Sequence, residues 1–344
     1  MMSAASSSFT FVDLCCGIGG NRVAMESLGG RCVYACELDP DARNVYENHF
    51  GQQPMPAHDL MEVTSLPPHD IMCAGPPCRS YSRANKGNCR ASSDEMSEPD
   101  HSTATRLWEH LLRLSTHTQC AMLFESTNTL TSANDKTVYT HLRTRIQQHA
   151  DKVYDAVLDA SDYGVPQIRK RWFCVAFKRS GVTTPFTFPS PTVSTPVPIA
   201  SILEPTPKIQ HVKNRPMTFK STSSCYNTKA KCIGFINHLN TQNRRVYAVD
   251  QPGPCLTTTG AIYVMHEPKT RKQRKTCKFT KRCNDVQLRM LSIRELTAYM
   301  GFPNDYHLPE QRVRSTRLLG RAVPPPVIRA IGTSMIKHLG QSLL

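Results

Sequence analysis

The chain has 344 residues, which is enough for one large domain and one smaller domain. Its 42 lysines and arginines outnumber its 27 aspartates and glutamates, so the formal net charge is +15, although only 20% of the residues are charged. This composition excludes a disordered polyelectrolyte and indicates a globular protein with a polyanionic partner. No run of 18 apolar residues occurs and no basic, apolar leader begins the chain, so we expect neither a secreted nor a membrane-spanning protein.

The first half of the chain alternates between strand and helix patterns. Short apolar runs predict strands at 9–14, 32–36, 70–74, 121–125 and 172–177. Amphipathic periodicity predicts helices at 21–30, 41–51, 106–114 and 138–149. Strands separated by helices indicate a parallel sheet with helices on both faces, which is an α/β fold.

The composition changes near residue 182. Prolines then recur every two to five residues, so we expect a linker. Residues 204–289 contain 17 lysines and arginines and four acids, and this basic window therefore holds most of the net charge. Helical periodicity returns at 293–300 and 326–339, and we expect the last segment to pack against the first domain.

The fourteen cysteines are expected to be buried or reactive thiols rather than disulfides, because a chain of this size without a leader belongs in a reducing compartment. Pairs such as Cys225 and Cys232 lack the spacing of a zinc site, so no metal site is predicted.

A glycine turn follows the first predicted strand. Gly17, Gly19 and Gly20 in CCGIGG connect that strand to a helix, an arrangement that faces a ligand crevice at the carboxyl ends of the strands. Glu37 lies 20 residues past Gly17, which is the separation at which such folds bind ribose hydroxyls. Asp59, at the expected end of a third strand, could accept a hydrogen bond from an adenine amino group. The pattern favours an adenosine-bearing ligand, and the alternative is a tight strand-to-helix connection with no ligand.

Cys78 stands on a Gly-Pro-Pro turn after the strand 70–74. The two prolines fix the backbone before it, and the nearby Arg79 and Arg83 favour the thiolate, which is the nucleophilic form. The alternative is a proline-rich surface turn that happens to contain a cysteine.

An acid and two arginines complete the candidate chemistry. Glu125 ends an apolar strand at the same edge, where partial burial would suit a proton donor. In QIRKRWF, strand alternation puts Gln167, Arg169 and Arg171 on one face, which suits a phosphate and a carbonyl oxygen. An exposed loop acid and a salt-bridged surface strand are the alternatives.

Together these segments resemble the cytosine-5 DNA methyltransferases, which use S-adenosylmethionine (S-adenosyl-L-methionine). The resemblance rests on blocks in the family's order: DLCCGIGG (13–20), ELD (37–39), HDL (58–60), GPPCRSYS (75–82), FEST (124–127), QIRKR (167–171), RMLSIRELTAYMGFP (289–303) and LGRAVPPPV (319–327). It implies a Rossmann-like methyltransferase domain with a parallel-rich sheet, formed by residues 1–181 and 307–344. Residues 182–306 would form a smaller, basic target-recognition domain.

The resemblance also implies roles for single residues. Cys78 would add to carbon 6 of a flipped-out cytosine, Glu125 would bind or protonate ring nitrogen 3, and Arg171 with Arg169 would hold the cytosine oxygen and a phosphate. The implied cofactor contacts are Asp13, Cys15, Gly17, Gly19, Gly20, Glu37, Asp59, Leu60, Pro77, Leu107, Arg321 and Val323. The expected contacts to double-stranded DNA are Gln167, Arg271, Lys272, Arg274 and Lys275. We expect a monomer inside the cell, in the nucleus of a eukaryotic host and otherwise in the cytoplasm.

Three positions depart from the family pattern. Cys15 replaces a phenylalanine beside the cofactor, Ser126 replaces an asparagine that braces the Pro-Cys loop, and Arg321 replaces an asparagine near the cofactor. Methylation of transfer RNA is one alternative to DNA methylation, because one branch of the family acts on transfer RNA. A catalytically silent DNA-binding protein is the other, and Ser126 and Arg321 motivate it. A nicotinamide oxidoreductase would leave Cys78 and the paired arginines unexplained.

Overall fold

The computed structural model describes residues 9–51, 59–76, 103–131, 136–178, 185–205, 217–219, 230, 232–236, 245–265 and 288–340. The chain divides into two compact units, of which the first comprises Met1–Leu158, Lys170–Ser190 and Val327–Leu344. The second comprises Asp159–Arg169 and Pro191–Pro326. Within the described residues, no helix has the length and apolar character needed to cross a membrane.

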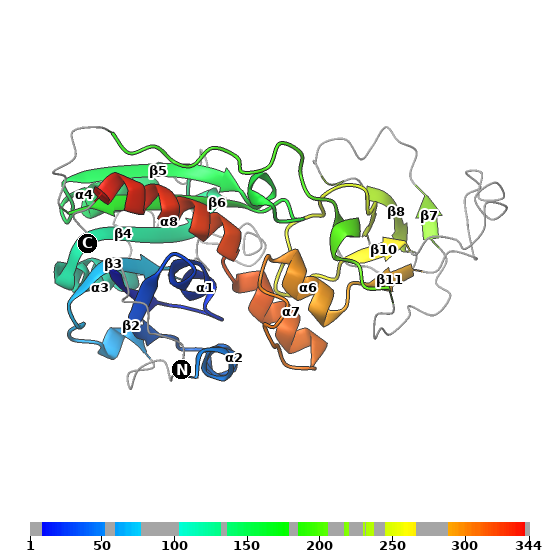
Figure 1. Ribbon diagram of the computed structural model, residues 1–344, viewed down its shortest axis with the longest axis horizontal. Helices are drawn as coiled ribbons and strands as arrows, with labels where there is room; N and C mark the ends of the chain where they lie inside the picture. The colour runs from blue at the N-terminus through cyan, green and yellow to red at the C-terminus, as the bar shows by residue number, and fades with distance from the viewer. Residues whose placement is uncertain are drawn as a thin grey trace, which may run out of the picture. The chain divides into compact units, whose positions relative to one another are not determined.

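A six-stranded sheet forms the centre of the first unit (Figure 1). Its strands are β1 (Phe9–Leu14), β2 (Gly30–Cys36), β3 (His69–Ala74), β4 (Thr118–Thr127), β5 (Lys152–Asp159) and β6 (Lys170–Phe177), in the order β2-β1-β3-β4-β6-β5. The first four are parallel, as predicted, but β6 runs antiparallel to β4. A strand buried on both faces has the same apolar sequence in either direction, so the sequence could not indicate this reversal. Strand β5 was not predicted.

Helices cover both faces of this sheet, which confirms the predicted α/β architecture. They are α1 (Gly20–Glu26), α2 (Pro40–Phe50), α3 (Thr103–Leu114), α4 (Lys136–Gln147) and α8 (Pro325–Leu339). On one face, Leu14, Phe124 and alternate residues of the neighbouring strands form one apolar cluster with Trp108 of α3 and Ile146 of α4. Alternation along the strands places these residues on a single face.

Helix α8 returns to the first unit, as predicted for the last segment of the chain. The ring of His338 lies 4.5 Å from that of Phe177 in β6. A side chain at Gly332 would meet Leu28, 2.7 Å away, so α8 lies close to the end of α1. This packing explains why an apolar, amphipathic pattern occurs so near the C-terminus.

Helix α1 ends earlier than predicted. The predicted helix extended to residue 30, but Gly29 has a φ of 86° and Gly30 already belongs to β2. A Cβ atom at Gly30 would lie 2.6 Å from the ring of Phe9. The two glycines therefore reverse the chain and let β2 approach β1, rather than closing a longer helix.

The second unit is built on a five-stranded sheet of short strands. These are β7 (Met217–Phe219), β8 (Cys232–Ile236), β9 (Arg245–Tyr247), β10 (Tyr263–Met265) and β11 (Leu288–Met290), in the order β11-β10-β9-β8-β7. Helix α6 (Ile293–Tyr299), which was predicted, begins with a capping box of Ser292 and Glu295. Helix α7 (Arg312–Arg321) was not predicted.

Candidate active site

The predicted site residues of the first unit gather at one edge of its sheet. Parallel strands β1, β2, β3 and β4 all end at this edge, and the antiparallel β6 begins there. The glycine turn follows β1, Glu37 follows β2, and Glu125 lies near the end of β4. Ligands of open α/β sheets bind at this edge, because loops from several strands converge there.

The glycine turn requires its glycines. Gly17 and Gly19 have φ values of 55° and 82°, which other residues rarely adopt. A Cβ atom at Gly19 would lie 2.5 Å from the ring of Phe50, so α2 packs directly against this turn. Cys15 shares the left-handed conformation, with a φ of 53°, although it is not a glycine. Such a position costs about 1 kcal/mol for an ordinary residue and is typical of functional turns.

Glu37 lies at the glycine turn, as its spacing predicts. One carboxylate oxygen accepts a hydrogen bond from the backbone N–H of Gly17 at 2.8 Å. The other accepts one from the backbone N–H of Asp39, also at 2.8 Å. Each carboxylate oxygen accepts more than one hydrogen bond, so the same carboxylate that orients the turn could also receive ribose hydroxyls.

The expected adenine contacts belong to one side of the same region. Leu60 is buried in the apolar cluster that also contains Cys36, and Cys15 and Leu107 are half-buried against it. Asp59 was predicted to lie at the end of a strand, but it precedes a single 3₁₀ turn (Leu60–Glu62). Its carboxylate accepts a hydrogen bond from the N–H of Met61 at 2.9 Å. Its carboxylate and that of Glu37 both help to raise the pKa of the Cys36 thiol to about 12, after burial as the main cause.

Two exposed apolar side chains flank these acids, and the sequence reasoning missed them. Leu38, directly after Glu37, is 64% exposed, and Met61, two residues after Asp59, is 39% exposed. Large apolar side chains exposed beside polar acceptors are typical of binding sites. The signal available in the sequence was a large apolar residue one position after Glu37 and two positions after Asp59.

Asp13, an expected cofactor contact, is completely buried, and its predicted role stays a prediction. One carboxylate oxygen accepts a hydrogen bond from Asn21 at 2.9 Å, and the other has no hydrogen-bond partner in the described part of the chain. Burial raises the pKa of Asp13 from 3.8 to about 7, and the hydrogen bond from Asn21 only partly opposes this. Asp13 therefore fixes the first turn of α1 through its hydrogen bond with Asn21.

We expect Asp13→Asn to stabilise the protein at high pH. Because folding raises the pKa of Asp13, its contribution to stability is complete below about pH 4 and is lost as the pH rises through about 7. Asparagine stays neutral and can still accept the Asn21 hydrogen bond. The free energy of unfolding of the variant should exceed that of the wild type by up to about 4 kcal/mol at pH 8.5, and by little at pH 4.

Urea unfolding at the two pH values measures this difference. Asp70→Asn serves as the control, because the Asp70 carboxylate accepts two hydrogen bonds from Thr10 at 2.7 Å and its loss should not stabilise the protein at either pH. An Asp13→Asn variant whose advantage does not change between pH 4 and pH 8.5 would contradict the assignment of a buried, proton-binding carboxyl.

Glu125 and Arg171 form an ion pair at the sheet edge. The Arg171 Nε lies 3.2 Å from a carboxylate oxygen of Glu125, and the two side chains are 15% and 13% exposed. Arg171 pairs with Thr127 across the two strands, and Glu125 is two residues before Thr127, so both side chains project from the same face. The antiparallel β6 is what delivers an arginine to the end of β4. The sheet thus brings two of the predicted catalytic residues together.

Gln167 and Arg169 do not share a strand face with Arg171, which corrects the predicted alternation. Strand β6 begins only at Lys170, so the alternation does not reach them. Gln167 is completely buried, accepts a hydrogen bond from the N–H of Leu256 and donates one to the carbonyl of Tyr299. Arg169 is 2% exposed, and its guanidinium donates to backbone carbonyls of the second unit. Their predicted roles toward DNA and substrate stay predictions.

Comparison with known proteins identifies the family. The sequence profile of the C-5 cytosine-specific DNA methylases matches residues 9–337, which is nearly the whole chain. The chain belongs to the C-5 cytosine-specific DNA methylases. It is therefore a DNA cytosine-5 methyltransferase, with DNA as the substrate and a methyl donor as the second reactant.

Relatives of this methylase include the type II methyltransferase M.MspI of Moraxella sp, which is 30% identical over 95% of this chain and 70% of that protein. M.HpaII of Haemophilus parainfluenzae is 26% identical over 96% of this chain and 90% of that protein. Among solved structures, a mutant of DNMT2 from Spodoptera frugiperda has a TM-score of 0.66 at 18% identity, over 95% of this chain and 99% of that one. This likeness supports the α/β methyltransferase fold.

Several predicted site residues of the methylase lie outside the described residues. These are Pro77 and Cys78, together with the basic residues Arg271, Lys272, Arg274 and Lys275. Arg321 and Val323 lie in the second unit, at the end of α7 and just after it. Their predicted roles stay predictions.

The cysteines of the methylase that the structure describes form no disulfide. Cys16, Cys36, Cys73 and Cys174 are buried, as expected for thiols in a core. Burial raises the pKa of Cys32 to about 12 and that of Cys16 and Cys73 well above its ordinary value. None of these thiols is a nucleophile near neutral pH, because the thiolate is the reactive form.

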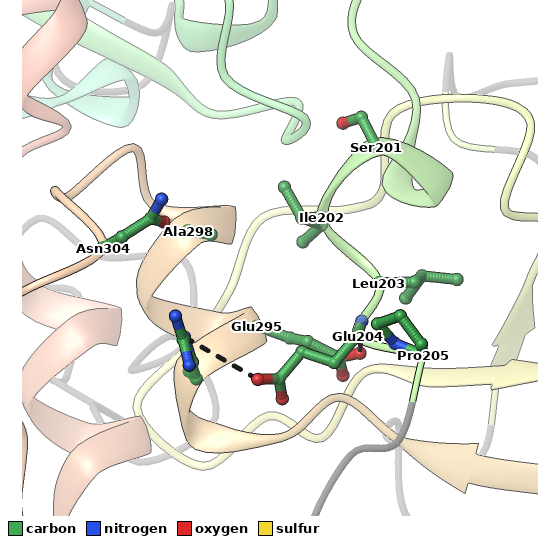
Figure 2. Close-up of a pocket in the computed structure, with 9 residues that line it drawn as sticks. Ser201, Ile202, Leu203, Glu204, Pro205, Glu295, Ala298 and Asn304 are labelled. Carbon is green, nitrogen blue, oxygen red and sulfur yellow. Dashed lines mark hydrogen bonds and ion pairs between the residues drawn. The ribbon is translucent and has the colours of Figure 1, made fainter.

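The second unit of the methylase carries a shallow pocket of about 390 Å³ (Figure 2). Glu204 and Arg294 line it and form an ion pair, with 3.7 Å between the Arg294 Nε and a carboxylate oxygen of Glu204. Glu295 is buried below them, and its carboxylate already accepts hydrogen bonds from Arg289 and from the backbone N–H of Ser292 and Glu204. None of the predicted site residues lines this pocket. Its charged side chains pair with other groups of the second unit, so we do not include this pocket in the candidate active site.

Proposed function

We propose that this methylase transfers a methyl group from S-adenosylmethionine to carbon 5 of cytosine in double-stranded DNA, through a covalent Cys78 adduct on a flipped-out base. The observation that carries the proposal is the Glu125–Arg171 pair at the carboxyl edge of the sheet. Strand β3 ends beside this edge at Ala74, and Cys78 follows four residues later. The acid and the arginine lie at this edge in the structure, and we assign the thiol of Cys78, which lies outside the described residues, to the same edge.

The proposed chemistry balances with these three groups. The Cys78 thiolate forms a bond to carbon 6, and the displaced electron pair moves toward ring nitrogen 3, where Glu125 stabilises or protonates it. Carbon 5 becomes nucleophilic and takes the methyl group, while the bond between that group and the donor sulfur breaks and S-adenosylhomocysteine leaves. Solvent water then takes the carbon 5 proton, the electron pair of that bond forms the carbon 5–carbon 6 double bond, and the Cys78 thiolate departs. Arg171 would hold the cytosine oxygen while it orients Glu125.

The described residues of the first unit suit an adenosine-bearing methyl donor. Glu37 offers acceptors for ribose hydroxyls and Asp59 for an adenine amino group, while Leu38 and Met61 offer apolar contact to a base. The glycine turn leaves room for close approach, since no atom lies within 4 Å of a Cβ placed on Gly17. S-adenosylmethionine, when bound, supplies an electrophilic methyl group.

Domain organisation and assembly belong to the same proposal. We assign catalysis to residues 1–181 and 307–344 and DNA recognition to residues 182–306, in a monomeric enzyme. Because its substrate is DNA, the enzyme would act inside the cell. The basic window, which holds most of the net charge, would provide phosphate contacts.

Neutralising part of this window should weaken DNA binding and reduce its salt dependence. The variant replaces Arg271, Lys272, Arg274 and Lys275 with alanine. If each residue contacts one phosphate, the slope of log K against log salt should fall by about 3 to 4, while cofactor affinity stays unchanged. Fluorescence anisotropy with a labelled duplex measures both affinity and slope.

The matched control removes the same charge from exposed positions of the first unit. It replaces Arg31, Arg106, Lys152 and Arg329 with alanine. An equal loss of DNA affinity in the control would show that net charge alone matters, and would contradict a recognition role for residues 271–275.

The proposed reaction is tested with labelled S-adenosylmethionine and two polymers. The wild-type protein should label duplex DNA and leave transfer RNA unlabelled. A duplex that contains 5-fluorocytosine should trap a covalent complex, because the fluorine cannot leave carbon 5 as a proton does. Label in transfer RNA alone would replace the substrate, and labelled DNA without a trapped complex would overturn the covalent mechanism.

A further inference from the structure

The side chains of Gln167 and Arg169 hold a neighbouring segment of the second unit in place, a role that the sequence did not predict. Both are buried in the second unit, where they contact the segment 253–256. Gln167 also pairs with Gly253 in a parallel bridge, with hydrogen bonds from Ile168 N–H to the Gly253 carbonyl (2.8 Å) and from Gly253 N–H to the Pro166 carbonyl (2.9 Å). The chain at 166–169 therefore acts as a template for this segment.

The backbone polar groups of Gly253, Pro254 and Leu256 all have defined partners. The carbonyl of Pro254 accepts from the Tyr299 hydroxyl at 2.6 Å. The N–H of Leu256 donates to Gln167 at 2.9 Å, and its carbonyl accepts from Arg169 at 3.1 Å. Gly253 has no space for a side chain, because a Cβ atom there would lie 2.1 Å from the Tyr299 hydroxyl. This pairing makes the segment 253–256 a rigid support for the turn at 257–260.

A threonine-rich turn follows this segment. The N–H of Gly260 bonds to the carbonyl of Thr257 at 3.2 Å, and Thr257 and Thr259 are exposed. The turn also contacts the last turn of α7, since a Cβ atom at Gly320 would lie 2.6 Å from the carbonyl carbon of Thr257. The exposed hydroxyls therefore project from a turn that is held on two sides.

Arg169 joins these two sides. Besides the Leu256 carbonyl, its guanidinium bonds to the carbonyls of Gly320 at 3.0 Å and Ala322 at 2.8 Å. The last carbonyls of a helix lack partners within the helix, so one arginine here satisfies the end of α7 and fixes the threonine turn to it. A guanidinium can serve three carbonyls in different directions, and an ammonium group could not reproduce this fork.

We propose that Arg169, with Gln167, is a positioning residue that couples DNA binding to cofactor binding. Its hydrogen bonds to the carbonyls of Leu256, Gly320 and Ala322 hold the start of the Thr257–Gly260 turn, whose exposed threonines we assign to DNA, in register with residues 320–323, which contain the proposed cofactor contacts Arg321 and Val323. Binding to either segment then orders the other, so each ligand raises the affinity for its partner. We call the hydrogen bonds of Arg169 to the carbonyls of Leu256, Gly320 and Ala322 the clamp. The coupling rests on the proposed function, whereas the clamp does not.

The test compares Arg169→Met with Arg312→Met. Arg312 is also a largely buried arginine of the second unit that donates to a backbone carbonyl, that of Leu291 at 2.6 Å, but it lies at the opposite end of α7. Both variants should lose thermal stability. Hydrogen exchange of the amides at 256–260 should accelerate in Arg169→Met by about tenfold or more, as expected for the loss of charge-assisted hydrogen bonds, and stay near wild type in Arg312→Met.

Binding measurements test the coupling. In the wild type, a DNA duplex should lower the Kd for S-adenosylhomocysteine, and S-adenosylhomocysteine should lower the Kd for DNA by the same factor. Arg169→Met should bring this factor close to one and raise the KM for DNA more than it lowers kcat, with Arg169→Lys in between. Arg312→Met should keep the wild-type factor.

Two results would overturn the proposal and one would not. Unchanged exchange at 256–260 in Arg169→Met would disprove the clamp, and a wild-type coupling factor in that variant would disprove its role in coupling. If the wild-type protein binds neither ligand, the proposed function fails instead, and the exchange comparison still decides whether the clamp exists.

Discussion

Replacing Glu125 by glutamine is expected to slow methyl transfer by about 10² to 10⁴-fold, which is the usual contribution of a positioned proton-transfer group. Glutamine keeps the shape of the side chain but can neither protonate ring nitrogen 3 nor balance the charge of Arg171. The arginine, 15% exposed, would be left without its 3.2 Å partner. Because Arg171 would also lose its orientation toward the cytosine oxygen, the effect should fall on kcat rather than on cofactor affinity.

Single-turnover transfer of labelled methyl groups to a duplex measures this rate. Glu109→Gln is the matched control, because Glu109 also pairs with an arginine of the first unit, Arg145, at 2.9 Å but belongs to α3. The Glu109 variant should keep its rate within about twofold, as expected for an exposed ion pair. A Glu125→Gln enzyme with the rate of the control would exclude Glu125 from proton transfer.

Cys78→Ser is expected to lower methyl transfer by a factor on the order of 10⁴ or more, as when the covalent nucleophile of an enzyme is removed. A serine hydroxyl is almost entirely protonated at neutral pH and is a poor nucleophile without a base beside it. The variant should still bind DNA and the cofactor. It should also fail to form a covalent complex with a 5-fluorocytosine duplex.

Cys120→Ser provides the control for general loss of a thiol. Cys120 is a half-buried cysteine of β4, outside the candidate site. Its variant should transfer methyl groups and trap the fluorinated duplex as the wild type does. Buried thiols such as Cys36 are poor replacements for Cys78, since burial raises the pKa of Cys36 to about 12. Trapping by Cys78→Ser would assign the adduct to another residue.

The structure shows the surroundings of two residues that depart from the family pattern, Ser126 and Cys15. Ser126, which stands where the family has asparagine, is buried between Glu125 and the end of β4. Cys15 keeps the left-handed backbone of the glycine turn, with half of its side chain against the apolar cluster. Neither departure disturbs the Glu125–Arg171 pair.

The chain's local patterns determined most of the first unit. The bounds of β1 agree with the prediction, and those of β3, β6, α2 and α3 lie within three residues of it, because each is an apolar run or an amphipathic segment closed by glycine or a loop. The position of Glu37 at the glycine turn also followed from spacing along the chain. These features depend on short-range geometry, which sequence periodicity reports directly.

The tertiary structure alone decided which neighbours Gln167, Arg169 and Arg171 contact. Sequence alternation put Gln167, Arg169 and Arg171 on one face, but the chain passes between the two units at Lys170. Arg171 pairs with Glu125 because β6 lies antiparallel to β4, while Arg169 turns to carbonyls of 256, 320 and 322. The +15 net charge and the motifs thus determined that this chain methylates a polyanion. Which arginine pairs with Glu125 and which is buried against backbone carbonyls depends on partners up to 153 residues away, and local pattern carries no information about them.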